Sequence, residues 1–284
     1  MTNKNVIVIG AGLGGLSAAI SLATEGFQVS VFEKNDKPGG KCNLDKINGF
    51  TFDLGPSILT MPHIFKALFD RAGKNMADYV SFEEVLPHWR NFFEDGTTLD
   101  LTPDMALMEK ELAKLPDDES HGFFQFLEYS RKLTKLTEDG YFKAGLDNFS
   151  ELTRYYGPLK SILGFDVFRT MDQGVRRFIK NEKLVDIMNY FIKYVGSSPY
   201  DSPALMNLLP YIQFGYGLWY VKGGMHNLAK ALEKLLNDLG GTIQYAAEVL
   251  EMKSNGTRVE GVQLAGGAFE KADVVVSNME VIPA

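Results

Sequence analysis

The first pattern in the chain is a short apolar run that leads into a cluster of glycines. Val6 to Ile9 are four β-branched residues, which is typical of a buried strand. An alanine-rich helix is predicted to follow, Gly26 to end it, and a second strand to end in Glu33. Strand, helix and strand in this order predict a βαβ unit and therefore an α/β fold with a parallel sheet.

Farther along, the pattern predicts one helix and one hairpin. Pro62 suits the first turn of a helix, for which Thr60 is a candidate cap and Gly73 a candidate end. Two β-rich runs within Trp89–Leu101 meet at Asp95-Gly96, a dipeptide typical of tight hairpin turns. We expect this hairpin to belong to a sheet outside the N-terminal βαβ unit.

The middle of the chain shows apolar positions at three- and four-residue spacing, which predicts helices. The clearest of them span Asp104–Leu115, Gly122–Leu136 and Lys183–Val195. Residues 120–220 also contain 21 of the 34 Phe, Tyr and Trp residues. Such side chains either fill a helical core or line an extended apolar tunnel for a long hydrocarbon, and composition leaves both interpretations open.

From about residue 217 the pattern returns to alternating strands and helices. It predicts a strand and a helix around Gly223-Gly224, a strand within Gly240–Met252, a hairpin turn at Asn255-Gly256 and a buried strand within Ala272–Pro283. The first domain is therefore expected to be discontinuous. Residues 1–75 and 216–284 build it, and a largely helical α+β domain of residues 76–215 is inserted between them.

The glycine cluster after the first strand has the spacing of a dinucleotide-binding turn. Gly10, Gly12 and Gly15 form a G-x-G-x-x-G motif, with Gly14 as an extra glycine. Gly10 permits the tight turn, Gly12 lets the backbone approach a pyrophosphate, and Gly15 lets helix and strand pack closely. The helix start offers unpaired N–H groups to the phosphates, and Glu33 is placed to accept hydrogen bonds from a ribose diol.

Charge and composition exclude several other functions. The 284 residues carry a formal net charge of −7, which disfavours nucleic acid as a partner. Cys42 is the only cysteine and the four histidines are dispersed, so no disulfide framework, redox cysteine pair or metal site is predicted. No apolar run reaches the length of a membrane span and no signal peptide precedes the first strand, so we expect a cytoplasmic protein.

One segment, residues 154–193, is basic although the chain is acidic. It has four acidic side chains and eight basic ones, which are Arg154, Lys160, Arg169, Arg176, Arg177, Lys180, Lys183 and Lys193. A basic and aromatic stretch suits docking on an anionic membrane surface. Local pairing of these charges on a solvated helix face is the other explanation.

The segments after Glu33 resemble those of flavoproteins with two dinucleotide-binding domains. Gly39-Gly40-Lys41 and Asp53-x-Gly55 follow in the order typical of that superfamily, whose first Rossmann-like unit holds the ADP half of FAD. Over its whole length the chain resembles the bacterial phytoene-desaturase type of carotenoid flavoproteins. The matching segments are Gly10–Gly15, Glu33, Gly39–Lys41, Phe52–Pro56, Val221–Met225 and Val276–Asn278.

This resemblance implies an FAD-dependent oxidoreductase that acts on a carotenoid, with peripheral association at the inner face of the cell membrane. The cofactor-binding residues that it implies are Gly10, Gly12, Gly14, Gly15, Glu33, Lys34, Gly40, Lys41, Gly55, Pro56, Ser57, Val249 and Ser277. Of these, Val249 is expected beside the adenine through its backbone. No metal ligand and no catalytic residue stand out.

Five blocks are more similar to one branch of the family, the oxygenases that convert a terminal methyl of C30 apocarotenoids to an aldehyde. They are Gly55–Pro62, Trp89–Leu101, Tyr190–Ala204, Gly217–Gly224 and Ser277–Pro283. A C30 or C40 carotenoid desaturase is the alternative, followed by another amine-oxidase-like flavoprotein and a non-enzymatic prenyl-binding relative. Members of the family are longer, so we also expect an N-terminal fragment without their C-terminal glycine-rich segment.

Overall fold

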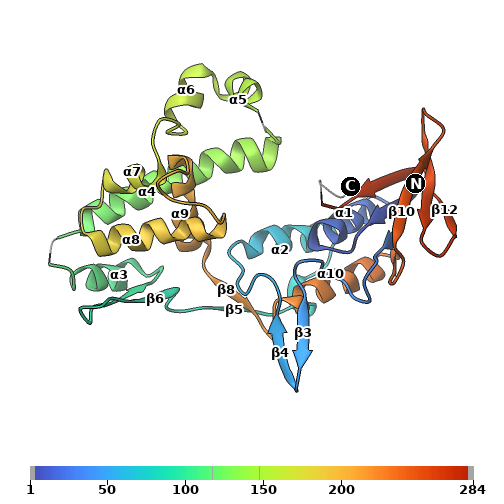
Figure 1. The fold of residues 1–284 in the computed structure, drawn as a ribbon, viewed down its shortest axis with the longest axis horizontal. Helices are drawn as coiled ribbons and strands as arrows, with labels where there is room; N and C mark the ends of the chain where they lie inside the picture. Colours follow the sequence, from blue (N-terminus) through green and yellow to red (C-terminus); the bar gives the residue numbers. More distant parts are fainter. Residues whose placement is uncertain (1–3, 117, 147, 281–284) are drawn as a thin grey trace. The chain divides into compact units, whose positions relative to one another are not determined.

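Two structural units share the chain (Figure 1). Residues 1–83 and 219–284 form unit 1, and residues 84–218 form unit 2. The computed structural model describes residues 4–116, 118–146 and 148–280. The unit boundaries fall after residues 83 and 218, whereas the sequence pattern suggested boundaries after residues 75 and 215.

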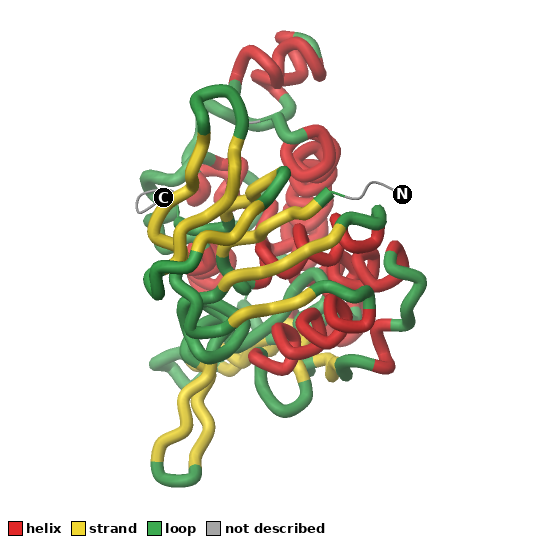
Figure 2. Tube along the Cα trace, turned by 90° about the vertical axis from the view of Figure 1, so that its right-hand side faces the viewer, coloured by secondary structure: helices red, strands yellow, loops and turns green. Residues whose placement is uncertain are grey.

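A four-stranded parallel sheet forms the centre of unit 1 (Figure 2). Its strands are, in spatial order, β13 (Val274–Ser277), β1 (Asn5–Ile9), β2 (Gln28–Phe32) and β9 (Thr242–Gln244). The apolar run of β1 is continuous because this strand is covered on both faces. Val6 and Val8 belong to one core cluster, and Ile7 and Ile9 belong to another.

Other elements of unit 1 are two small sheets, three helices and a short turn. They are β3 (Leu44–Ile47) with β4 (Phe50–Asp53), β10 (Val249–Ser254) with β11 (Val259–Leu264) and β12 (Phe269–Lys271), α1 (Leu13–Thr24), α2 (Pro62–Arg71), α10 (His226–Asp238) and the 3-10 turn η1 (Met76–Asp78). A further two-stranded sheet pairs β5 (Phe82–Glu84) with β8 (Trp219–Val221).

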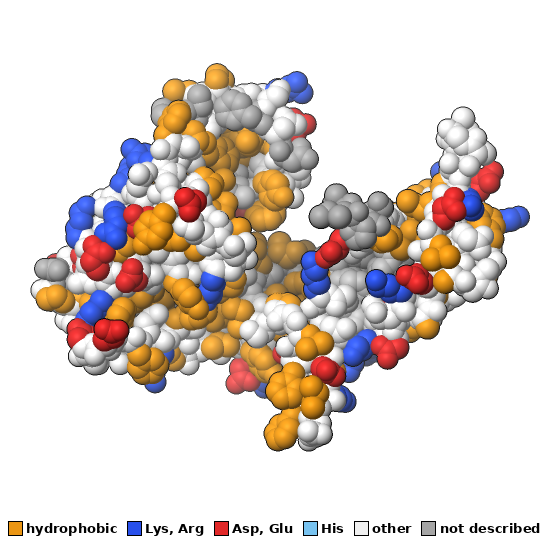
Figure 3. All heavy atoms as spheres, viewed as in Figure 1, with side chains coloured by type: hydrophobic (Ala, Val, Ile, Leu, Met, Phe, Trp, Pro, Cys, Tyr) orange, Lys and Arg blue, Asp and Glu red, His pale blue; other side chains and the backbone are white. Residues whose placement is uncertain are grey.

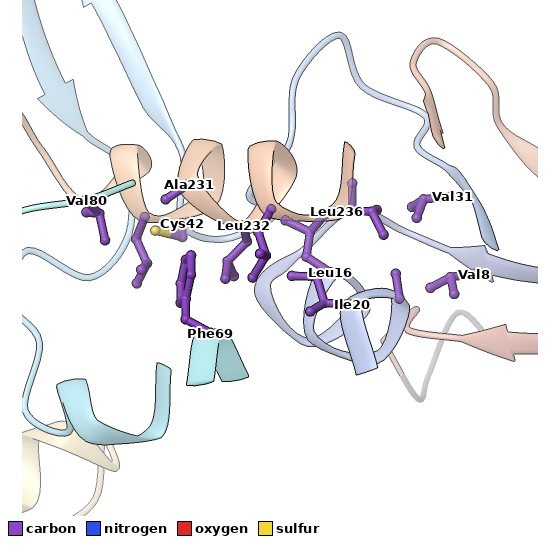
Figure 4. Packing of buried hydrophobic residues seen from close by; sticks show 14 of the residues in the cluster. Val8, Leu16, Ile20, Val31, Cys42, Phe69, Val80, Ala231, Leu232 and Leu236 are labelled. Atoms are coloured by element: carbon purple, nitrogen blue, oxygen red, sulfur yellow. The ribbon is translucent and has the colours of Figure 1, made fainter. Parts of the chain in front are cut away.

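Helices cover one face of the central sheet and strands cover the other. On the helical side, Leu16 of α1 and Leu232 of α10 pack in the cluster that includes Val8 (Figure 4). On the other side, Val262 of β11 packs in the cluster that includes Ile7. The sheet therefore packs between two apolar layers, and the site described below lies at the ends of its strands.

Three local predictions for unit 1 were wrong. The segment Gly240–Met252 contains two strands, β9 and β10, in different sheets, because Ala246 turns the chain with a φ of 51°. The predicted buried strand near the end is β13, which lies at the sheet edge with Val274 38% exposed. Met61 precedes the first residue of α2 and no side chain caps the helix, so Thr60 is not its cap.

Unit 2 contains one hairpin followed by helices. Its elements are β6 (Trp89–Phe92), β7 (Thr98–Leu101), α3 (Met105–Leu112), α4 (Ser120–Thr137), the π-helical segment η2 (Glu138–Lys143), α5 (Phe149–Tyr156), α6 (Pro158–Leu163), α7 (Met171–Arg176), α8 (Glu182–Tyr190), the 3-10 segments η3 (Phe191–Tyr194) and η4 (Ala204–Asn207), and α9 (Leu208–Tyr216). The predicted hairpin and the three predicted helices are all present. The hairpin forms its own two-stranded sheet, as expected.

The many aromatic side chains of unit 2 lie in two different surroundings. Phe123, Phe126 and Phe214 lie in the buried cluster, where Phe123 and Phe214 meet edge to face with ring centroids 5.8 Å apart. In contrast, Phe168 and Tyr200 are exposed. Core filling accounts for the first group, and the substrate tunnel stays a prediction. No helix in the described ranges is long and apolar enough to cross a membrane.

Local partners surround most of the basic residues of segment 154–193. Carboxylates pair with Arg169, Arg176, Arg177 and Lys183, aromatic rings lie under Lys160 and Lys193, and a backbone carbonyl accepts from Lys180. Local pairing therefore describes the geometry of this segment. It does not cancel the charge, because Asp166 alone serves two of the arginines.

The packing of α1 against β1 gives a first test. A Cβ atom on Gly15 would overlap the backbone carbonyl oxygen of Gly10, which has no freedom to move away. We expect Gly15→Ala to lower the free energy of unfolding by roughly 1–3 kcal/mol, as overpacking does. Urea denaturation measures this. Gly266→Ala is the control, because its added Cβ meets nothing within 4 Å; equal midpoints for both variants would contradict the close packing.

A buried histidine gives a second test. His88 is almost fully buried, neither ring nitrogen has a hydrogen-bond partner in the described chain, and burial lowers its pKa from 6.5 to about 4. The unfolded chain therefore takes up this proton at a higher pH than the folded protein. The free energy of unfolding therefore has its full value above pH 6.5. It falls by roughly 3 kcal/mol as the pH is lowered toward 4.

The variant His88→Phe removes this titration while filling similar space beside Phe214. We expect the difference in unfolding free energy between variant and wild type to grow in favour of the variant from pH 6.5 down to pH 4. Exchange of the exposed His121 for Phe is the control for the His-to-Phe substitution itself. A constant difference between His88→Phe and wild type across this range would contradict the burial argument.

Candidate functional site

The glycine-rich turn joins β1 to α1 at the carboxyl end of the central sheet. Gly10 has a φ of 94°, which favours glycine, and its N–H donates to the carbonyl of Phe32 at 2.8 Å. Gly12 precedes the helix, and no side chain caps the helix there. The first turn of α1 thus presents backbone N–H groups and the positive end of its dipole at the sheet edge.

Glycine stands at the remaining positions of the turn for different physical reasons. A Cβ on Gly15 would overlap the carbonyl oxygen of Gly10, and one on Gly14 would lie 2.8 Å from Nδ2 of Asn278. Gly12 has an ordinary φ of −68°, and no described protein atom comes closer than 3.5 Å to its would-be Cβ. The protein's own packing does not require glycine at this position, whereas a closely approaching ligand does.

Glu33 follows β2 and turns its carboxylate toward the glycine turn. Its side chain is buried, one oxygen accepts from the N–H of Ala11 at 2.7 Å, and the other accepts from the backbone N–H of Asn35 at 2.9 Å and its amide at 2.6 Å. A carboxylate offers about four acceptor sites, so capacity for a ribose hydroxyl remains. The glutamate is therefore held in place by the backbone before any ligand binds.

The second glycine pair lies directly against the first turn. The N–H of Gly39 donates to the carbonyl of Ala11 at 2.8 Å, and Gly39 has a φ of 115°. A Cβ on Gly55 would overlap the carbonyl oxygen of Lys41, so this glycine lets two backbone segments pass closely. The exposed Lys41 forms an ion pair with Glu280 beyond β13. Segments from both ends of the chain thus meet at one place.

A cavity of about 650 Å³ opens between these segments, a size typical of cofactor sites. Eight of the thirteen predicted residues line it, namely Gly10, Gly12, Glu33, Lys34, Gly40, Lys41, Pro56 and Val249. The segment that contains Val249 is held there because the N–H of Ala247 donates to the carbonyl of Glu33 at 2.9 Å. The glycine turn and the carboxylate of Glu33 lie at different points of the cavity wall, which suits the ADP half of a dinucleotide.

Five predicted residues lie outside the cavity wall. They are Gly14, Gly15, Gly55, Ser57 and Ser277. Gly15 and Gly55 allow close backbone packing, as described above. Ser57 and Ser277 are exposed, and the Ser277 hydroxyl accepts from the N–H of Met279 at 3.5 Å.

Asn278 lines the cavity, although the sequence analysis only placed it in a matching segment and did not name it as a candidate site residue. Its side-chain oxygen accepts from the N–H of Gly15 at 2.8 Å, and it lines the cavity beside the glycine turn. The position of Asn278 in the sequence could have indicated this. Ligands of open α/β sheets bind beyond the carboxyl ends of the strands, and Asn278 directly follows β13. The polar amide of Asn278 is therefore a better candidate for a cofactor-binding group than the hydroxyl of Ser277.

The chemistry of the surroundings favours binding and orientation over reaction by protein groups. Among the described residues no group of three His, Cys, Asp or Glu side chains is arranged for a metal ion. Cys42 is buried, and burial together with the nearby Asp53 raises the pKa of its thiol. A thiol held in its neutral form is a poor nucleophile, so Cys42 does not suit a redox role.

The ribose assignment of Glu33 gives a third test. In protein purified from the complete reading frame that contains this chain, Glu33→Arg should abolish FAD retention, because a cation replaces the buried acceptor. Glu33→Gln keeps the side-chain shape and should weaken retention less. The ratio of flavin to protein absorbance measures both. Glu25→Arg, at an exposed site after α1, is the charge-matched control; unchanged flavin content in folded Glu33→Arg would contradict the assignment.

Comparison with known proteins agrees with this geometry. The family model described as flavin containing amine oxidoreductase matches residues 13–281. A 4,4'-diapolycopene oxygenase of Methylomonas sp. is 64% identical over 99% of this chain and 57% of its own length. A 4,4'-diaponeurosporene oxygenase of Staphylococcus haemolyticus is 48% identical over the whole chain and 56% of its own length.

The fold has solved counterparts as well. The PF1083 protein from Pyrococcus furiosus superposes with a TM-score of 0.66 at 20% identity, covering 98% of this chain and 60% of that protein. The chain thus spans a little over half the length of the curated relatives it matches. A match that covers nearly the whole chain, together with the glycine turn and Glu33, leads to one conclusion: this chain belongs to the flavin-containing amine oxidoreductase family, with a Rossmann-like fold and FAD as its cofactor.

Proposed function

We propose that this chain acts in an FAD-dependent oxidation that converts the terminal methyl of a C30 apocarotenoid to an aldehyde. The observation that carries the proposal is the 64% identity to a diapolycopene oxygenase over 99% of the chain. The cavity in unit 1 supports it, because its residues suit the nucleotide half of FAD. The net reaction balances with dioxygen, since a methyl group plus O₂ gives an aldehyde plus water.

The chain's own residues bind and orient in this proposal. Glu33 would accept hydrogen bonds from the adenosine ribose, and the N–H groups at the start of α1, beside Gly12, would hold the pyrophosphate. FAD, when bound, supplies the redox chemistry at an allylic carbon. These residues would anchor the ADP half of the cofactor, from which the redox-active ring extends.

Pigment analysis tests the proposal. The complete reading frame that contains this chain is expressed in bacteria that accumulate C30 carotenoids, and the extracts are analysed by mass spectrometry. We expect products in which an end group has gained one oxygen and lost two hydrogens, formed under air and absent without it. The Glu33→Arg variant should abolish them, and Glu25→Arg should not.

Two outcomes would contradict the proposal. Products that lose pairs of hydrogens without gaining oxygen would identify a carotenoid desaturase and leave the FAD site intact. Unchanged pigment from a protein that carries FAD would overturn the carotenoid substrate. The flavin content of the purified protein separates failure of the cofactor site from failure of the substrate assignment.

A further inference from the structure

One lysine of unit 2 lies against three aromatic rings. Lys193 belongs to η3. Its Nζ atom is 2.8 Å from the ring centroid of Trp89, 4.2 Å from that of Tyr190 and 5.3 Å from that of Tyr194. The rings of Trp89 and Tyr190 meet edge to face, with centroids 5.8 Å apart. The amine of Lys193 therefore lies in an aromatic cluster of three rings, which come from β6, α8 and η3.

A buried amide holds two of these rings in place. The side-chain oxygen of Gln213 accepts from Nε1 of Trp89 at 2.8 Å and from the hydroxyl of Tyr194 at 3.1 Å. Gln213 is 1% exposed, and an indole N–H can only donate, so the amide must turn its oxygen toward Trp89. The aromatic cluster is therefore positioned by the core of unit 2 before any ligand binds.

The surroundings of the amine favour its neutral form. Among the described residues no carboxylate lies at ion-pair distance from Lys193. Apolar side chains of Leu101, Ile187 and Phe191 line a small cavity beside it. The faces of the rings attract the ammonium form, whereas removal of water opposes it. Removal of water has the larger effect, because burial lowers the pKa of Lys193 to about 8.

A lysine in this environment can act as a nucleophile. With a pKa of about 8, about one amine in ten is unprotonated at pH 7, compared with fewer than about one in a thousand for an ordinary lysine. A neutral lysine amine adds to the carbonyl carbon of an aldehyde. The rings of the cluster suit an apolar, conjugated ligand, and Tyr190 is 57% exposed, so one side of the cluster is in contact with solvent.

A purely structural role explains these contacts less well. Cation–π contacts could anchor η3 to β6, and such an anchor is strongest when the lysine is charged. The burial of Lys193 instead favours the neutral amine, and no carboxylate among the described residues lies close enough to oppose this. The environment therefore suits a reactive amine better than a charged anchor.

We propose that Lys193 binds a conjugated apolar aldehyde as an imine. In this step the C=O bond of the aldehyde is replaced by a C=N bond, and the two hydrogens of the amine leave with the oxygen as water. Nothing is oxidised or reduced, and hydrolysis reverses the step. The choice of an aldehyde rests on the proposed function, whose product belongs to this class.

Reductive trapping tests the proposal. Protein purified from the complete reading frame that contains this chain is incubated with all-trans-retinal, a conjugated apolar aldehyde, and with cyanoborohydride, which reduces an imine to a stable amine. Peptide mass spectrometry then locates the retinyl group. Near neutral pH we expect about tenfold or more labelling at Lys193 than at the exposed Lys110 of α3, because more of the Lys193 amine is neutral.

The pH dependence separates a reactive site from an accessible one. Labelling of Lys193 should rise with a midpoint near pH 8, whereas that of Lys110 should keep rising toward the pKa of an ordinary lysine. The neighbouring phenol of Tyr194 stays neutral over this range, since burial raises its pKa to about 12. Labelling spread equally over exposed lysines, or a midpoint near 10 at Lys193, would overturn the proposal.

A matched pair of variants completes the experiment. Lys193→Arg keeps the positive charge but cannot form the imine, and should abolish labelling at this peptide. Lys110→Arg is the control and should leave the labelling of Lys193 as in wild type. Because the aldehyde is added and not produced by the protein, absence of labelling overturns the lysine site and leaves the proposed oxidation untouched. Pigments without aldehyde groups would overturn the proposed function and leave a labelled Lys193 standing.

Discussion

The close approach of α1 to β1 is the constraint on which the FAD site depends. Because Gly15 has no Cβ, the first turn of the helix rests on the carbonyl of Gly10. Three further segments attach to the same turn through single hydrogen bonds: the Glu33 carboxylate accepts from Ala11, the N–H of Gly39 donates to Ala11, and the side-chain oxygen of Asn278 accepts from Gly15. A small displacement of the turn would therefore move these three segments of the cavity wall together.

The two units use the same kinds of residue for different purposes. In unit 1 the charged groups at the cavity are few and individually positioned, as for Glu33, whose buried carboxylate is oriented by two backbone N–H groups and the side-chain amide of Asn35. In unit 2 the buried carboxylate of Asp166 instead pairs with two arginines, Arg169 and Arg177, and accepts a hydrogen bond from the hydroxyl of Tyr129. Precise orientation suits a cofactor that must present one ring face.

Local patterns in the sequence predicted much of the fold. The glycine turn, the hairpin at Asp95-Gly96 and the helices with strong three- and four-residue spacing are specified by residues close together in the chain, so they were found where expected. Two of the three errors share one cause. The turn at Ala246 and the edge position of β13 depend on which strands pair, and a pairing partner some 270 residues away leaves no mark on local periodicity.

The chemistry of the site was determined by the sequence, because the residue types and spacing of Gly10, Gly12, Gly15 and Glu33 suit one class of ligand. Only the tertiary structure decided which other residues join them. Parallel pairing of β13 with β1 brings Asn278 to the helix start, while Ser277, one residue earlier, stays outside the cavity wall. The physical reason is that successive residues of a strand point to opposite faces, so strand pairing selects which neighbour reaches the ligand.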